Sequence, residues 1–281
     1  MLFTRTRGRK ERHRGMEQVP QSPPRWGDDP LSKFMSEADH NARVTALRWP
    51  DVYEVQQRAA ALLERIGEIL ELDPDDANLL VPRTLVIRSR SAILGAMRSA
   101  MSGQAVEAQP VLRQAIENAW YALHVARDPA PPTRAQIWWD RDVSEEAIRA
   151  CRAEFTVANV RQTHEALDAD TVAAMKKLYD DTITHGGHPN ERGVASSLRI
   201  DRSRPGVVRL GVGILHPGTA IAMGTLKAAV DVTVGVAKTV GLIYSFRFRF
   251  MEVDDQINRL AQHSAAVFPK YAEAARNGAL T

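Results

Sequence analysis

The sequence predicts a mostly α-helical fold, a bundle of six or seven helices with one inserted β-hairpin. Apolar residues recur at the helical period through most of the 281 residues. One short stretch, near residues 197–213, instead alternates apolar and polar residues as a pair of strands does. The composition, 44% hydrophobic and 25% charged, is typical of a globular chain with a core. We therefore expect one helical-bundle domain over residues 45–276.

The basic, proline-rich segment 1–30 is predicted to be a disordered tail. Its first fifteen residues carry a net charge of +5, which leaves about −2 for the rest of the chain. Three interpretations of the tail stay open. The first is an arm that contacts nucleic acid or another anionic surface, and the second is an arginine-rich targeting peptide. The third is an unstructured extension upstream of a start at Met16. The near-neutral body gives no indication of a nucleic-acid-binding domain.

The single cysteine, Cys151, excludes an intramolecular disulfide and is typical of a reducing compartment, so we expect a soluble, cytoplasmic protein. Cys151 lies on the apolar side of a helical pattern, which favours a buried side chain over a nucleophile. The most apolar region, 207–246, contains four charged residues and lacks the roughly 20 uncharged residues of a membrane span. We expect no membrane span. Because phosphate loops and dinucleotide fingerprints are absent, we expect no cofactor.

Five helices are predicted before the hairpin, over about 51–72, 77–102, 106–127, 143–167 and 170–186. The acidic and proline-containing segment 73–76 separates the first two, and Gly103 ends the second. Asp142 and Glu145 have the spacing of a capping box for the fourth helix. The fifth ends near Gly186, where glycine is expected to take the left-handed cap conformation.

Two helices are predicted after the hairpin. The first follows Pro217-Gly218, and its glycines, Gly224, Gly235 and Gly241, indicate close approach of neighbouring backbones. The last has the cleanest period in the chain, with steps of four and three residues. That stripe can face the core or form a homodimer seam, and the core-facing interpretation is favoured. Its members are Phe246, Phe250, Val253, Ile257, Leu260, Ser264 and Val267.

A column of polar and aromatic residues runs along the third helix, beside its apolar stripe. The column consists of Arg113, Glu117, Trp120 and His124, at steps of four, three and four residues. An aromatic ring among charged side chains indicates a second, partly buried interface with a polar network. The alternative is an exposed helix face whose Arg113–Glu117 pair contributes about 0.2–0.5 kcal/mol.

The densest group of polar residues is the turn Thr184–Arg192, which contains His185, His188, Asn190 and Glu191. Helix termination explains much of it, because a histidine and glycines are typical of a helix C-terminus. The functional interpretation places the turn beside Arg113, Glu117 and His124 as a site for an anion or a polar molecule. A metal site would need further ligands, so none is predicted.

Two segments of the chain resemble parts of known families. They are the helix pair from about Ala77 to Arg127, with its Arg-x3-Glu step, and the segment Tyr179–Asn190, with its His-Pro-Asn turn. They resemble uncharacterised bacterial helical-bundle families, which are similar to the broader HEPN-like group of four-helix proteins. That group includes RNA-cleaving toxins and defence proteins, so the resemblance implies an RNA-related function. It covers about Asp51–Glu191.

HEPN-like ribonucleases carry an arginine and a histidine that are further apart in sequence than the corresponding pairs here. The nearest matches are Arg161 with His164 and Arg259 with His263, separated by two and three residues. Only the second spacing places both side chains on one helical face. Ribonuclease activity through Arg259 and His263 is therefore a hypothesis that rests on fold analogy.

The leading functional hypothesis is a binding or interaction module with little or no catalytic activity. Arg113 would receive an anion, Glu117 would orient it or a histidine, and the turn residues would complete the site. Two alternatives remain, a metal-independent HEPN-like ribonuclease and a metal-dependent hydrolase that uses His185 and His188. Whether the protein is an enzyme stays open.

Overall fold

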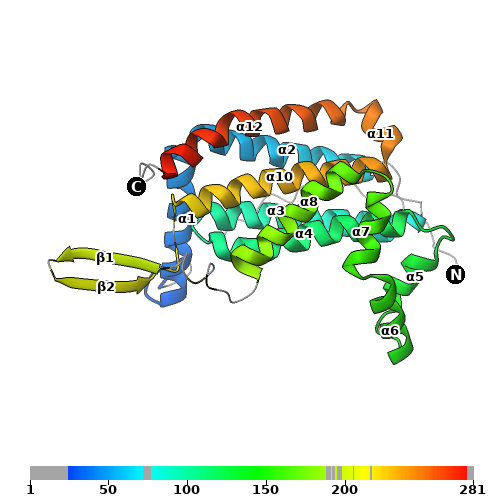
Figure 1. Cartoon of the computed structure of the whole chain (residues 1–281), viewed down its shortest axis with the longest axis horizontal. Helices are drawn as coiled ribbons and strands as arrows, with labels where there is room; N and C mark the ends of the chain where they lie inside the picture. The colour runs from blue at the N-terminus through cyan, green and yellow to red at the C-terminus, as the bar shows by residue number, and fades with distance from the viewer. Residues whose placement is uncertain are drawn as a thin grey trace. The chain divides into compact units, whose positions relative to one another are not determined.

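The computed structural model describes residues 25–71, 77–187, 191, 194, 198–204, 206–215 and 217–276. Within these residues the chain forms eleven α-helices and one two-stranded antiparallel sheet, so the mostly helical class is confirmed and the predicted number of helices is wrong (Figure 1). The helices are α1 (Pro30–Arg48), α2 (Pro50–Glu71), α3 (Leu80–Met101), α4 (Ala105–Ala126), α5 (Thr133–Trp139), α6 (Glu145–Glu154), α7 (Val157–Glu165), α8 (Ala169–Thr182), α10 (Ala220–Ile243), α11 (Ser245–Phe250) and α12 (Val253–Arg276). A 3-10 turn (Ala77–Leu79) precedes α3, and a π turn (Ile183–Gly187) follows α8.

Contacts divide the chain into two compact units, residues 1–37 and residues 38–281. In the first unit, Asp29 caps α1 by accepting hydrogen bonds from the backbone N–H groups of Leu31 and Ser32 and from the Ser32 hydroxyl. These bonds lower the pKa of Asp29. Helix α1 was not expected from the apolar period. Of the predicted tail, residues 1–24 lie outside the described residues.

The core of the second unit surrounds α10, which contacts α2, α3, α4, α8 and α12 (Figure 1). Its buried side chains are almost all aliphatic or small, as Val230, Val236 and Val240 illustrate. By length and composition alone, α10 could cross a membrane, but 61% of its most apolar window is buried inside the protein. The core helix of a soluble protein passes the same test, which fits the contacts of α10.

Helices α3 and α4 form the most extensively packed pair, and they match the prediction closely. The apolar stripe of α4 is buried at Leu112, Ile116, Ala119 and Leu123. Polar side chains also cross between helices, since the Ser89 hydroxyl donates to the Ala115 carbonyl at 2.7 Å. Gly103, with φ of 93°, ends α3 as expected.

Two predicted helices are each divided, because a local signal outweighs the apolar period. The predicted helix 143–167 becomes α6 and α7, each begun by a hydroxyl cap, Ser144 on the Ala147 N–H and Thr156 on the Asn159 N–H. Asp142 is therefore not the cap. The last helix is broken at Glu252, whose φ is 53°, so Phe246 and Phe250 are 74% and 81% exposed. The rest of that stripe is buried in the chain's own core: Val253, Ile257, Leu260, Ser264 and Val267.

The hairpin is confirmed as β1 (Leu198–Arg204) and β2 (Val207–Val212), paired antiparallel. Leu198 lies opposite Val212 and Ile200 opposite Leu210, so the alternating apolar positions share one face. The register shifts between Asp201 and Arg204, and Gly206 takes a positive φ of 74° in the turn.

Candidate functional site

The polar column of α4 includes a partly buried contact between α4 and α8. The Glu117 carboxylate accepts a hydrogen bond from the Tyr179 hydroxyl at 3.1 Å and lies 3.5 Å from the Arg113 guanidinium. The Trp120 ring packs against the Tyr179 ring, with centroids 5.5 Å apart. Arg113 and Glu117 keep about a third of their side-chain surface exposed, so they hold α8 against α4 at the edge of the core.

His124 is buried one turn further along α4, and both ring nitrogens have partners. Nε2 lies 3.0 Å from Glu154 Oε1 and Nδ1 lies 2.7 Å from Thr163 Oγ1. Because an ionised carboxylate can only accept, Nε2 carries the proton and Nδ1 accepts from the Thr163 hydroxyl. Burial and the nearby Arg134 charge lower the pKa of His124, which favours this neutral form.

Arg134 of α5 completes this network and fixes the α5–α6 segment on the end of α4. Its Nε donates to Glu154 Oε1 at 2.7 Å. Its Nη1 donates to the carbonyl oxygens of His124 and Arg127 at 3.0 and 3.1 Å. Burial raises the pKa of Glu154, but hydrogen bonds from Arg134 and His124 outweigh burial and hold it below its usual value. The network is therefore satisfied internally, which is typical of a structural role.

Replacing Arg134 by Met should destabilise the protein by about 2 kcal/mol, since carbonyl and carboxylate acceptors lose their donor. The change should also raise the pKa of His124, because the Arg134 charge lowers it. Urea unfolding measures the first effect and an NMR titration of the His124 ring the second. The matched control is Arg149→Met, which removes an exposed pair with Glu146 and should cost less than about 1 kcal/mol. Equal losses for both variants would contradict the assigned network.

The predicted turn site is only partly within the described residues. His185 is exposed in the π turn and Glu191 is exposed, whereas His188 and Asn190 lie outside the described residues. The π turn packs on the start of α4, where the Gly186 Cα lies against Val106 and Gln109. Gln109 is about one helical turn before Arg113. No described contact joins His185 to Arg113 or Glu117, and convergence of the turn on the α4 column stays a prediction.

Gly186 has a different role from the predicted helix cap. Its φ is 179°, an extended value that any residue adopts, so the left-handed cap prediction is wrong at this position. A Cβ at Gly186 would lie 2.4 Å from the Val106 carbonyl oxygen and 3.0 Å from Gln109 Cβ. Glycine is needed here because the π turn approaches the α4 backbone closely.

The two Arg–His pairs of the ribonuclease hypothesis have different surroundings. His164 is 0% exposed, and neither ring nitrogen has a hydrogen-bond partner among the described residues. Burial lowers its pKa to about 4, against a weaker opposite effect of Asp168. Arg259 is exposed and His263 half-buried on one face of α12, as predicted. Ribonuclease activity through the second pair stays a prediction.

Within the described ranges, no group of three or more His, Cys, Asp or Glu side chains is placed to hold a metal ion. Cys151 is buried and free, as expected, and burial raises the pKa of its thiol. A raised pKa disfavours the reactive thiolate, which fits the interpretation of Cys151 as a small core residue.

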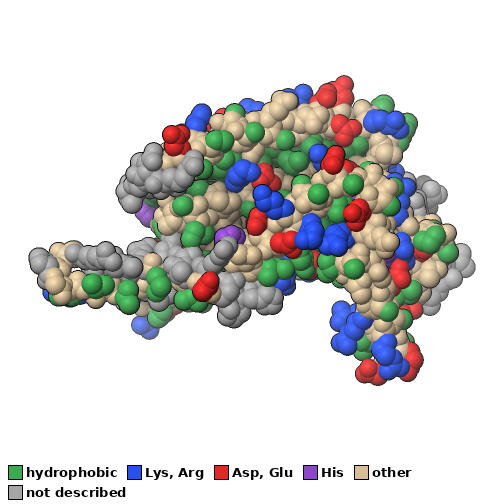
Figure 2. Space-filling view, viewed as in Figure 1, with side chains coloured by type: hydrophobic (Ala, Val, Ile, Leu, Met, Phe, Trp, Pro, Cys, Tyr) green, Lys and Arg blue, Asp and Glu red, His purple; other side chains and the backbone are tan. Residues whose placement is uncertain are grey.

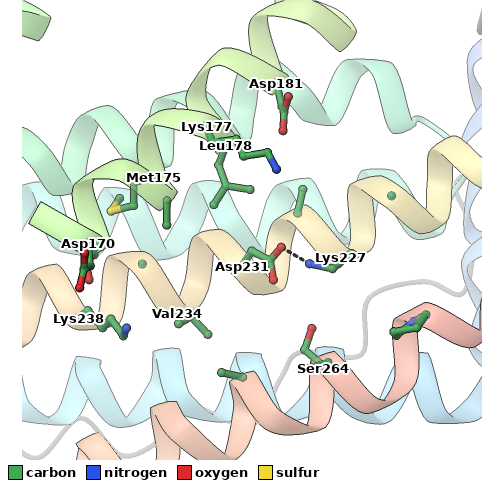
Figure 3. A pocket seen from close by; sticks show the side chains of 18 residues that line it. Asp170, Met175, Lys177, Leu178, Asp181, Lys227, Asp231, Val234, Lys238 and Ser264 are labelled. Atoms are coloured by element: carbon green, nitrogen blue, oxygen red, sulfur yellow. Dashed lines mark hydrogen bonds and ion pairs between the residues drawn. The ribbon is translucent and has the colours of Figure 1, made fainter. Parts of the chain in front are cut away.

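A groove of about 770 Å³ lies between α8, α10 and α12 (Figure 3). Its floor and walls are mainly apolar or small, and include Met175, Leu178, Gly224, Ala228, Val234 and Ala265. A second cavity of about 370 Å³ shares Gly224 and Lys227 with it and continues between α10 and α12. The space therefore extends along α10, from near Lys238 to Ala220, over about 27 Å.

One hydroxyl group in the groove has no hydrogen-bond partner among the residues that the structure describes. Ser264 is 3% exposed and lines the groove from α12, and its Oγ is unpaired among the described residues. Figure 3 shows its side chain directed from α12 toward α10. A buried hydroxyl without a partner costs free energy, about 1–3 kcal/mol, so an unsatisfied group in a cavity indicates a place for a ligand or water.

Charges of both signs surround the groove and cancel. Lys227 pairs with Asp231 at 2.5 Å, and further lysines and aspartates come from α8 and α10 (Figures 2 and 3). The six charged residues are Lys177, Lys227, Lys238, Asp170, Asp181 and Asp231. The rim therefore has no net charge and favours neither an anionic nor a cationic ligand.

The groove escaped prediction because its members are small residues on separate helices. Side chains, rather than the neighbouring backbones that were expected, lie close to Gly235 and Gly241. Each of these two glycines has a close neighbour, since a Cβ there would meet the side chain of Met175 or Phe248 at 2.7 or 3.0 Å. Gly224 does not, because no described atom lies within 4 Å of its Cβ position. In sequence the three glycines are alike, and only the packing shows which of them have a close neighbour and which line the groove.

No protein-family model, curated protein or solved structure matches this chain. Function is therefore inferred from the groove and from the side chains around it.

Proposed function

We propose that the protein is a binding protein whose groove between α8, α10 and α12 holds an elongated, mainly apolar molecule with one hydrogen-bonding group. The observation that carries the proposal is the buried hydroxyl of Ser264 in the wall of the 770 Å³ cavity, which has no partner among the described residues. A ligand group that bonds to Ser264 Oγ would satisfy that hydroxyl and orient the ligand.

The dimensions of the groove support a small molecule. Binding sites for such ligands usually measure about 300–1,000 Å³, with mainly apolar walls and a few placed polar groups. Met175, Leu178 and Val234 supply apolar walls, and Ser264 supplies the polar group. Because the rim charges cancel, a neutral ligand meets no unbalanced charge at the entrance.

The polar column of α4 supports the groove from behind. Tyr179 bonds to Glu117 through the face of α8 that meets α4, while Met175 and Leu178 line the groove. Glu117, paired with Arg113, then positions a wall of the site through Tyr179, and these charged groups need not contact the ligand.

Replacing Gly224 by Leu should weaken binding of the neutral, apolar dye Nile red by at least about tenfold. A Cβ at this position has no described atom within 4 Å, and because Gly224 lines the groove, the larger side chain would take up space in it. Titration of the dye against the purified full-length protein, followed by fluorescence, gives the dissociation constant. Ser264→Ala keeps the cavity but removes the hydroxyl, and should weaken binding by about fivefold.

The matched control is Gly95→Leu on α3. Gly95 also lies within a helix and has no described atom within 4 Å of its Cβ position. It belongs to α3, which contributes no residue to the groove. Both substitutions should stabilise their helices slightly, by about 0.5–1 kcal/mol. The proposal fails if Gly224→Leu binds the dye as tightly as the wild type, or if Gly95→Leu loses binding equally.

A further inference from the structure

The β-hairpin carries a second, independent feature, an exposed aliphatic face. Val208 and Leu210 are 62% and 71% exposed, and Leu198 and Ile214 are exposed as well. The register places Leu198 and Leu210 on the same face, with Val208 next along it. A two-stranded ribbon is only marginally stable in water by itself, so an aliphatic face of this kind is expected to be covered in use.

The same hairpin is strongly basic. Residues 198–212 contain four arginines and one aspartate, a net charge of +3, whereas the other residues after residue 15 together carry about −5. Of these, Arg204 and Arg209 are exposed, and Arg209 lies opposite Asp201 on the face away from Leu210. Figure 2 shows hydrophobic side chains along the hairpin. Aliphatic and cationic groups are thus presented together on one short ribbon.

We propose that the hairpin docks the protein on an anionic lipid bilayer. Its aliphatic face would enter the boundary between headgroups and acyl chains, about 5–10 Å deep, as the apolar face of an interfacial helix does. The arginines would then lie at the level of the lipid phosphates, because the ribbon is itself only a few ångströms thick. Each arginine near an anionic surface strengthens binding about fivefold.

Charge distinguishes this occupant from a second copy of the chain or from a nucleic acid. Two hairpins stacked through their aliphatic faces would bring two net charges of +3 together, which disfavours a dimer formed in this way. A nucleic acid would pair with the arginines but leave the aliphatic face in water. A bilayer with anionic headgroups satisfies both faces at once.

The test is flotation of the full-length protein with large unilamellar vesicles. One set contains phosphatidylglycerol and phosphatidylcholine in equal parts, and the other contains phosphatidylcholine alone. We expect binding to the anionic set that weakens as salt is raised, because the Debye length shortens. Arg204→Gln with Arg209→Gln should reduce the partition coefficient by about 25-fold. Restoring the charge as Lys at both positions should restore most of the binding.

Leu210→Asn should reduce the partition coefficient by about tenfold. The matched control is Leu47→Asn on α1, a leucine that is 83% exposed against 71% for Leu210, and it should leave vesicle binding unchanged. Any contribution of the basic segment 1–15 is common to all variants and cancels in the comparison.

Three outcomes would overturn the docking proposal. The first is an equal loss of vesicle binding for Leu210→Asn and Leu47→Asn, and the second is a protein that binds no vesicles but forms a dimer that Leu210→Asn dissociates. The third is a protein that binds a single-stranded RNA oligonucleotide instead of vesicles, with RNA binding abolished in the double glutamine variant. None of them bears on dye binding in the groove, because the hairpin and the groove share no residue.

Discussion

Lowering the pH should destabilise the protein by about 2 kcal/mol between pH 7.5 and 5, and by about 3 kcal/mol by pH 4, through His164 alone. His164 is fully buried and its folded-state pKa is about 4, against about 6.5 for an unfolded histidine. Between these values the unfolded chain binds a proton that the folded protein excludes. The stabilisation is therefore complete above about pH 6.5 and is lost as the pH falls.

Urea unfolding at pH 7.5 and pH 5, for the wild type and for His164→Leu, isolates this effect. Leucine has a similar volume and no nitrogen, so the variant should be more stable at pH 7.5 by about 1–3 kcal/mol. The reason is that it removes two buried nitrogens that have no partner among the described residues. The difference between the two proteins should grow as the pH falls. His124 and Glu154 also titrate, but they are present in both proteins and cancel. An unchanged pH dependence in His164→Leu would show that another group is responsible.

Replacing Gly186 by Ala should destabilise the protein by about 1–3 kcal/mol. The added methyl group would lie 2.4 Å from the Val106 carbonyl oxygen, a backbone atom that cannot rotate away. Either the π turn or the start of α4 must then move. Denaturant unfolding measures the loss, and the turn should also become more accessible to limited proteolysis near His185.

Gly95→Ala provides the opposite expectation. It lies in the middle of α3 with open space at its Cβ, so alanine should stabilise the protein by about 0.5–1 kcal/mol through helix propensity. If Gly186→Ala were as stable as Gly95→Ala, the close packing of the π turn on α4 would be wrong.

Much of the bundle could be predicted because its signals are local and repeated. The stripe of α4 and the hairpin alternation were both visible in the apolar period, and the structure confirms them. The breaks at Thr156 and Glu252 were not, since a hydroxyl cap and one residue with positive φ outweigh an apolar pattern that continues across them. Helix α1 was missed because its capping residue, Asp29, is followed by exposed apolar residues such as Leu31 without a clear stripe.

The candidate site was harder to predict, because a groove is defined by what is absent between helices. Polar residues such as His185 and Arg113 predict a site from the sequence, while Gly224 and Ala228 have no functional group that would predict one. Ser264 fell within an apolar stripe and was assigned to the core, which is correct for its burial but not informative about its unpaired hydroxyl. Only the packing of α8 and α12 on α10 shows what these residues share.

The apolar character of α10 has a consequence for how the chain is made. Four of the helices that contact it, α2, α3, α4 and α8, precede it in the sequence, and α11 and α12 follow. During synthesis, these four can leave the ribosome and associate before α10 emerges, because folding proceeds from the N-terminal side. Helix α10, which resembles a membrane span, would then pack directly against an apolar surface formed by these four helices. A circular permutation that places α10 first should expose α10 before its partner helices are made, and we expect more aggregation or membrane insertion of the nascent chain.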